Sequence, residues 1–144
     1  MKSFLKMKLK YLLLILLISV IGLQAANNKM LFGIWEIVEF KMVQRGVETV
    51  SDVKTLRDAG AVWDMYFNAD GTFKQEFNMR GNEMKMETES GKWRTVNDSL
   101  YIYLQTDTLA ATLKYSYILL GDVVVFTMQN QRNNDKIITR FRRK

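Results

Sequence analysis

Residues 61–77, AVWDMYFNADGTFKQEF, decide the fold, because two runs of alternating apolar and polar residues flank a short turn sequence. This alternation is typical of strands with one buried and one exposed face. The central segment NADG suits a type I turn closed by a glycine bulge, which pairs Phe67 with Phe73 and sets Trp63 opposite Phe77. The stretch therefore predicts an antiparallel hairpin with one aromatic face.

The same alternation extends in both directions, with Gly, Asn and Asp between the runs and no proline in the chain. Only Ser51 to Ala59 departs from it, since Val53 and Leu56 have helical spacing and Ser51 suits the N-cap of a short helix. The runs predict eight strands. They are Leu31–Val43, Ala61–Phe67, Thr72–Met79, Glu83–Val96, Ser99–Thr106, Ala111–Leu120, Val123–Gln131 and Lys136–Arg142.

Further turns place the inward residues of neighbouring strands on one common face, and a slip of one residue would turn them outward. Two-residue turns are predicted at Asn97-Asp98, Gly121-Asp122 and Asn133-Asn134. The cross-strand pairs that follow are Trp93 with Ile102, Thr95 with Leu100, Leu119 with Val124, Tyr117 with Phe126, Tyr115 with Met128, Met128 with Thr139, and Phe126 with Phe141.

The connection around Gly81-Asn82 is also interpreted as a two-residue turn, which pairs Phe77 with Met86. Met86 and Trp93 would then face opposite sides of one strand, so we expect a bulge at Ser90-Gly91 to restore the face. This register assigns three acidic residues to the exposed outer face, namely Glu83, Glu87 and Glu89. Eight strands with one apolar face close most simply into a single antiparallel up-and-down β-barrel, an all-β domain over residues 26–144.

The first 25 residues have the composition of a secretion signal. Lysines 2, 6, 8 and 10 precede an apolar run from Tyr11 to Leu23, which as a helix would be too short for the roughly 30 Å hydrocarbon core. We expect cleavage after Ala25, with cleavage after Ala26 as the alternative. Because the chain has no cysteine, it cannot be a lipoprotein, and we expect a periplasmic or secreted bacterial protein without disulfides.

Composition argues against catalysis and against nucleic-acid binding. The chain has no His and no Cys, so the usual general base, the thiol nucleophile and the main transition-metal ligands are missing. Four of the 21 Lys and Arg residues lie in the signal, which leaves 17 to balance 15 acidic residues. Met84 and Met86 share a spacing that could hold cuprous copper, but core packing is the expected role. We therefore expect a non-enzyme without a cofactor or metal.

Several short motifs together resemble the bacterial lipocalin-like domains of the lipocalin/calycin superfamily. They are Gly33-x-Trp35 on the first strand, Asp70 to Phe73, Gly91-Lys92-Trp93, and an arginine on the last strand. The resemblance implies that Trp35 plugs the closed end of the barrel under Arg140, with Arg142 as the alternative. It also implies that Gly46 to Gly60 forms a lid over the open end, and that a ligand would lie between this lid and Trp35.

The expected function is binding of a small hydrophobic or lipid-like ligand inside the barrel. A packed core without a cavity is the alternative structural interpretation, and a filled barrel acting as a protein-protein interaction module of the cell envelope is the alternative function. An outer-membrane barrel is disfavoured, because the apolar face closes on itself. The residues predicted to line the pocket are Trp63, Met65, Phe77, Met84, Met86, Tyr115, Tyr117, Phe126 and Met128.

Overall fold

The computed structural model describes residues 26–81 and 83–144, so the predicted signal peptide lies outside the described residues. A 3-10 turn, η1 (Lys29–Leu31), precedes the first strand, and a short helix, α2 (Val53–Asp58), follows the second. The strands are β1 (Gly33–Gln44), β2 (Val47–Ser51), β3 (Trp63–Phe67), β4 (Thr72–Phe77), β5 (Glu87–Val96), β6 (Ser99–Gln105), β7 (Ala110–Leu120), β8 (Val123–Gln129) and β9 (Lys136–Arg143).

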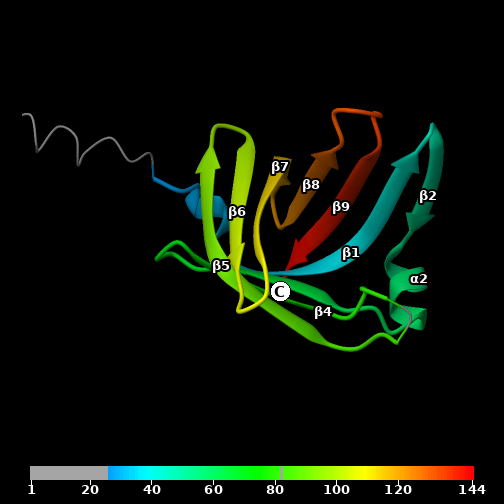
Figure 1. Ribbon diagram of the computed structural model, residues 1–144, viewed down its shortest axis with the longest axis horizontal. Helices are drawn as coiled ribbons and strands as arrows, with labels where there is room; N and C mark the ends of the chain where they lie inside the picture. The colour runs from blue at the N-terminus through cyan, green and yellow to red at the C-terminus, as the bar shows by residue number, and fades with distance from the viewer. Residues whose placement is uncertain (1–25, 82) are drawn as a thin grey trace, which may run out of the picture.

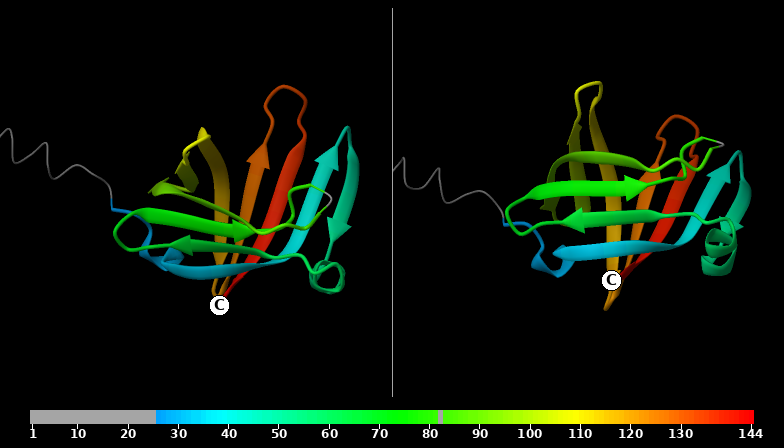
Figure 2. Two further views of the ribbon diagram at one scale, coloured as in Figure 1. Left: turned by 60° about the horizontal axis from the view of Figure 1, so that its bottom comes forward. Right: turned by 90° about the horizontal axis from the view of Figure 1, so that it is seen from below.

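The strands form one antiparallel sheet in the order β2-β1-β3-β4-β5-β6-β7-β8-β9, and β1 also pairs with β9. This extra pairing closes an eight-stranded up-and-down barrel and leaves β2 outside the ring, beside β1 (Figure 1). Figure 2 shows β3 and β4, in green, running crosswise in front of β8 and β9, in orange and red. The predicted all-β barrel is therefore confirmed.

Strand β2 was not predicted, and it changes the role expected of residues 46–60. Val47 to Ser51 pair with the second half of β1, so that Ser51 ends a strand and does not cap the helix. Asp52 is the N-cap, and its carboxylate accepts a 2.8 Å hydrogen bond from the Thr55 backbone N–H. The helix places Leu56 in the barrel core. The segment therefore extends the sheet beside β1 and packs against β1, where the resemblance to the lipocalin-like domains had implied a lid (Figure 1).

The closed half of the barrel is filled by aromatic side chains. Phe67 lies 5.1 Å from Trp93, 5.2 Å from Phe73 and 6.0 Å from Phe126, measured between ring centroids. Phe126 in turn lies 5.7 Å from Phe141. Tilted and edge-to-face contacts at these separations are the preferred geometry of aromatic pairs. This half of the interior is therefore a packed core, which was the alternative to a ligand pocket in the interpretation of the sequence.

Trp35 is fully buried at the closed end, and Arg143 covers it, not Arg140. The guanidinium carbon of Arg143 lies 4.3 Å from the Trp35 ring centroid, and the indole Nε1 donates a 2.8 Å hydrogen bond to the Leu31 carbonyl. Arg143 also donates to the carbonyls of Phe32 and Met30, at 2.6 and 2.7 Å. An arginine thus contacts Trp35, as expected. The two arginines that were predicted for this contact, Arg140 and Arg142, are instead exposed on the outer face of the barrel.

Gly33 is required at this plug for two reasons. Its φ of +122° lies in a region that residues with a side chain rarely adopt, and a Cβ at this position would lie 3.0 Å from Nη1 of Arg143. The guanidinium therefore passes over Gly33 on its way to the carbonyls. The residue that lies over Trp35 is thus Arg143, three positions beyond the predicted Arg140.

The register between β4 and β5 differs by one residue from the prediction, and this difference reverses the faces predicted for the start of β5, up to Ser90. Phe77 pairs with Glu87 and Gln75 with Glu89, because β4 ends at Phe77 and β5 begins only at Glu87, where a tight turn between the strands was expected. Glu89 consequently faces the interior, and no bulge at Ser90-Gly91 is needed to bring Trp93 inward. Met84 and Met86 lie on the connection and are exposed.

The register between β8 and β9 differs by two residues, which preserves the face. Residues 130–135 form a wider loop than the predicted turn, and the Asn130 N–H donates to the Asp135 carbonyl across it. Phe126 therefore pairs with Thr139, and Met128 with Ile137. The other predicted pairs agree with the structure where the ladders extend, including Phe67 with Phe73, Trp93 with Ile102 and Tyr117 with Phe126.

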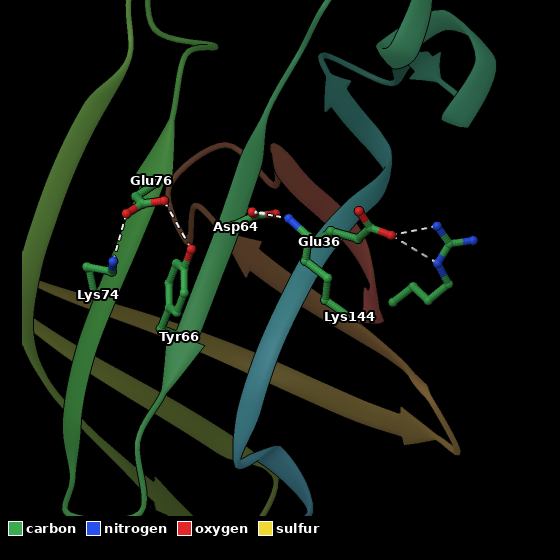
Figure 3. Close-up of polar contacts among 7 residues, drawn as sticks. Glu36, Asp64, Tyr66, Lys74, Glu76 and Lys144 are labelled. Atoms are coloured by element: carbon green, nitrogen blue, oxygen red, sulfur yellow. Dashed lines mark hydrogen bonds and ion pairs between the residues drawn. The ribbon is translucent and has the colours of Figure 1, made fainter.

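The outer face of β1, β3 and β4 carries linked polar side chains (Figure 3). Lys144 pairs with the largely buried Asp64 at 2.6 Å, and Glu76 accepts hydrogen bonds from both Lys74 and Tyr66. The Lys74 ammonium and the Tyr66 hydroxyl hold the pKa of Glu76 below its usual value. These contacts tie the last residue of the chain to β3 on the outside of the barrel.

We predict that Arg143→Met lowers the free energy of unfolding by about 2 kcal/mol, because it removes the stacking on Trp35 and two charged hydrogen bonds to carbonyls. Arg140→Met is the matched control on the same strand and should cost less than about 0.5 kcal/mol, since its side chain is exposed. Urea denaturation followed by tryptophan fluorescence measures both. Equal losses in the two variants would contradict the assignment of the plug to Arg143.

Candidate ligand-binding site in the barrel

A hollow of about 290 Å³ lies at the end of the barrel opposite Trp35. Met42, Met128 and Ile137 form its apolar floor, on the second half of β1 and the facing ends of β8 and β9. A shift in the β1–β9 register between Ile37 and Glu39 lets the second half of β1 turn Met42 inward. The rim consists of polar residues: Gln44, Asn130, Asp135 and Lys136.

The rim is held by a contact between two hairpin loops. The backbone N–H of Arg45, in the β1–β2 turn, donates a 3.0 Å hydrogen bond to the Asp135 carboxylate in the β8–β9 loop. Arg45 has a φ of 50°, a left-handed conformation that the turn imposes. The hollow therefore has a fixed wall on the β1–β9 side.

A chain of buried polar groups lies on the opposite wall, across β3, β4 and β5. The Trp63 indole Nε1 donates to Oε1 of Gln75 at 3.0 Å, and Nε2 of Gln75 donates to Oε2 of Glu89 at 2.6 Å. Gln75 and Glu89 are 4% and 5% exposed. Buried polar groups are retained only when they are hydrogen-bonded, so this chain orders the interior of the open half.

Arg80 completes the coordination of Glu89 from the β4–β5 connection. Its Nη2 donates to Oε1 of Glu89 at 2.9 Å, and its Nη1 donates to Glu87 at 3.1 Å. The guanidinium carbon lies 4.9 Å from the Phe77 ring centroid. Arg80 itself is largely exposed, with 59% of its side chain accessible. An exposed side chain thus reaches into the barrel to neutralise a buried carboxylate.

Asn78 anchors the start of this connection. Its side-chain oxygen accepts a 2.7 Å hydrogen bond from the Val62 N–H, and its amide nitrogen donates to the Gly60 carbonyl at 2.9 Å. The backbone of Asn78 also donates to Val62. The connection is therefore fixed to the segment between α2 and β3 just before Arg80, which positions the guanidinium over Phe77 and Glu89.

Tyr115 projects into the barrel from β7, next to the polar chain. Its ring lies 5.8 Å from that of Phe126, between centroids, and the residue is 6% exposed. Burial, followed by the charge of Glu89, raises the pKa of the Tyr115 hydroxyl to about 12. Tyr115 therefore places a hydroxyl, which can donate and accept hydrogen bonds, in the barrel interior.

The structure separates the predicted pocket residues into three groups. Met65, Tyr117 and Phe126 are buried in the packed core, and Met84 and Met86 lie outside the barrel on the β4–β5 connection. The remaining predicted residues are Trp63, Phe77, Tyr115 and Met128. Phe77 and Tyr115 are buried, and Trp63 and Met128 pack against the core. Of these four residues, Met128 alone lines the hollow.

Sequence reasoning missed the polar part of this interior, namely Gln75, Glu89 and Arg80. One signal was present: stepping back in twos from Trp93, which the Gly-x-Trp motif placed inward, gives Gly91 and then Glu89. The bulge predicted at Ser90-Gly91 interrupted this alternation, so that Glu89 was assigned to the outer face. Arg80 lies in an irregular segment, where no periodicity indicates the direction of a side chain.

A second hollow, of about 820 Å³, lies along the N-terminal segment, the β3–β4 turn and β5. Its lining includes Asn27, Asp70, Lys92 and Arg94, and it lies next to the start of the described chain. Asn27 and Asn28 attach this segment to β5 through hydrogen bonds with the Trp93 carbonyl and with Thr95. Among the described residues, no buried side-chain polar atom lacks a hydrogen-bond partner, either in this groove or in the barrel interior.

Two kinds of feature are absent from the described residues. No group of three or more His, Cys, Asp or Glu side chains in residues 26–81 and 83–144 is placed to hold a metal ion. In the same part of the chain, none of the helices has the length and apolar character that a membrane crossing needs.

The fold and the site together define a closed antiparallel barrel with a packed end and a partly polar open end. In comparisons with known proteins, no protein-family model matches the chain, and no curated protein matches it either.

The raised pKa of Tyr115 predicts a loss of stability at alkaline pH. The folded protein keeps this proton at pH values where the unfolded chain, with an ordinary tyrosine pKa of 10.0, has released it. The stabilisation of the folded protein by this proton is therefore complete below about pH 10, and it is lost as the pH rises towards about 12. Its size is on the order of 1–3 kcal/mol.

Urea denaturation between pH 9 and 12 measures this effect, with absorbance at 295 nm reporting tyrosine ionisation. The free energy of unfolding of Tyr115→Phe should fall less steeply over this range than that of the parent protein, since phenylalanine has no proton to lose. Tyr103→Phe, at an exposed ring, is the control and should follow the parent. Parallel curves for all three proteins would refute the assignment.

Proposed function

We propose that this protein binds a small ligand with an apolar body in the open half of its barrel, as a lipocalin-like binding protein without catalytic activity. The observation that carries the proposal is the hollow of about 290 Å³ over Met42, Met128 and Ile137, at the end of the barrel opposite the aromatic plug. Pockets for small molecules are typically concave, mainly apolar, and about 300 Å³ or larger. The hollow is at the lower end of that range, which favours a compact ligand or the end of a chain.

The distribution of side chains within the barrel supports this location. The closed half is occupied by Trp35, Phe67 and Phe126, so a ligand can enter only from the open end. Methionine side chains adapt to varied shapes, which suits the floor that Met42 and Met128 provide. At about 25 cal/mol per Å², burial of roughly 300 Å² of apolar ligand surface would gain about 7 kcal/mol before the entropic costs of binding. Micromolar affinity is the expected scale.

We predict that prodan, a neutral apolar fluorophore, binds the domain spanning residues 26–144 with micromolar affinity and a blue-shifted emission. Met128→Trp should weaken binding at least about tenfold, because the larger ring fills the hollow that Met128 lines. Fluorescence titration measures both affinities. Ile118→Trp is the matched control, since it adds the same ring on the outer face of β7, where Ile118 is 61% exposed.

Two outcomes would contradict the proposal. Prodan that fails to bind the parent domain, or that binds Met128→Trp and Ile118→Trp with equal affinity, would show that the hollow is not a binding site. Urea denaturation of each variant checks that it is folded under the conditions of the titration.

The proposal includes export with cleavage of the first 25 or 26 residues. Support comes from the basic start and apolar run of this segment, together with the contacts of Asn27 and Asn28, which attach the chain to β5 immediately after the expected cleavage sites. Cleavage at either position keeps both asparagines in the domain.

Expression of the full sequence in a bacterium tests the export. The chain recovered from the envelope or the medium should have the intact mass of a protein that begins at Ala26 or Asn27. Recovery of a chain that retains Met1 and remains with the cytosol would contradict the proposal.

A further inference from the structure

The acidic residues of the barrel strands are confined to one side of the ring. They lie on β1 and on β3 to β5, whereas β6, β7, β8 and β9 contain no Asp and no Glu. Five cations belong to β6–β9, and one of them, Arg143, is used in the plug over Trp35. The other four are at outward-facing positions of β7 and β9. They are Lys114, Lys136, Arg140 and Arg142.

The register of β7, β8 and β9, which stand side by side in Figure 1, arranges their outward residues in rows. Two neighbouring rows share one pattern, in which two aliphatic side chains are followed by an arginine. These rows are Leu120–Val123–Arg142 and Ile118–Val125–Arg140, which together are called the amphipathic face below. Ile118 and Leu120 are 61% and 60% exposed, so the aliphatic part of this face is open to solvent.

The cations of this region are only partly neutralised. Arg142 pairs with Glu36 of β1 at 2.6 Å, and Asp122, in the β7–β8 turn, pairs with Arg143 at 3.5 Å. Among the ion pairs of residues 26–81 and 83–144, none includes the other three outward cations of β7 and β9. Beyond β9, Glu36 and Glu39 on β1 mark the edge of the positive region. An excess of positive charge therefore surrounds the exposed aliphatic side chains.

This combination of charge and apolar surface identifies the kind of partner. Large exposed apolar side chains with a polar rim mark sites of protein or membrane interaction. A second copy of the chain would place like charges opposite each other, since the face bears arginines and no acid. A nucleic acid would contact the arginines through its phosphates but leave Ile118 and Leu120 without an apolar contact. The surface of an anionic bilayer offers both phosphates and an apolar layer beneath them.

On this basis we propose that the amphipathic face docks the barrel on the surface of a bilayer that contains anionic phospholipids. Ile118 and Leu120 enter the boundary between headgroups and acyl chains, while Arg140 and Arg142 donate hydrogen bonds to lipid phosphates. The face lies on the outer wall, next to Arg143 of the plug, so docking leaves the open end of the barrel accessible. It therefore goes beyond the proposed ligand binding and does not depend on it.

Co-sedimentation with sucrose-loaded vesicles tests the docking of residues 26–144, which contain the strands β1 to β9. One set of vesicles contains about 30 mol% phosphatidylglycerol in phosphatidylcholine, and the other contains phosphatidylcholine alone. The partition coefficient onto the anionic vesicles should be at least about tenfold higher, because each cation near an anionic surface adds to the affinity. Addition of about 0.5 M NaCl should remove most of this preference, since salt screens the attraction.

Variants on the face and away from it locate the contact. Arg140→Gln should lower the partition coefficient onto anionic vesicles about fivefold, and the double variant Ile118→Ser/Leu120→Ser about tenfold. The matched controls are Lys54→Gln in α2 and Val47→Ser on β2, which remove an exposed cation and an exposed aliphatic side chain outside the face. Both controls should stay within about twofold of the parent. Urea denaturation checks that each variant is folded.

The outcomes separate docking on a bilayer from other uses of the face. Equal partition onto the two kinds of vesicle, or equal losses in the face and control variants, would overturn the proposal. A dimer in analytical ultracentrifugation that Ile118→Ser/Leu120→Ser dissociates, in place of vesicle binding, would assign the face to a second copy. Retention on immobilised polyglutamate without vesicle binding would assign it to an acidic protein. Prodan binding is measured without vesicles, so a failure of docking leaves the proposed function unaffected.

Discussion

The pairing of β1 with β9 is the constraint on which the rest of the structure depends. Once the sheet closes, every second residue of each barrel strand must lie in one shared interior, and a change of register by a single residue exchanges inside and outside. The same pairing brings Arg143 over Trp35 at the closed end of the barrel. The location of the packed core and of the open half both follow from this closure.

The sequence predicted the parts of the fold in which local signals agree. Between Phe67 and Phe73, and between Tyr117 and Phe126, a recognisable turn and strict alternation gave the correct register. The prediction failed between β4 and β5, because Gly81 suggested a tight turn where Asn78 holds a long connection against the α2–β3 segment. That contact joins residues that are not neighbours in the chain, and no local pattern reports it.

The residues of the candidate site can likewise be divided into those that the local sequence pattern predicted and those that it did not. Of its apolar members, Met128 was predicted because alternation places large side chains inward, whereas Met42 and Ile137 were not predicted. Its polar members were not, since Glu89 in a strand is ordinarily an outward residue, and only Gln75 and Arg80 together make it tolerable inside. Arg143 was missed for a related reason: at the end of β9 it reaches back across Gly33 to the carbonyls of Met30 and Phe32.

The plug at Trp35 also has a consequence for the order of folding. Its parts come from η1, from β1 and from the end of β9, so the two sides of the contact are separated by nearly all of the described chain. Closing so large a loop costs entropy before any packing energy is gained, and contacts of this kind form late. Hairpins such as β3–β4 can assemble as soon as they leave the ribosome, whereas the ring itself cannot close until β9 has been synthesised. An incomplete chain therefore presents β1 and β8 as open sheet edges, which can pair with other chains until β9 is in place.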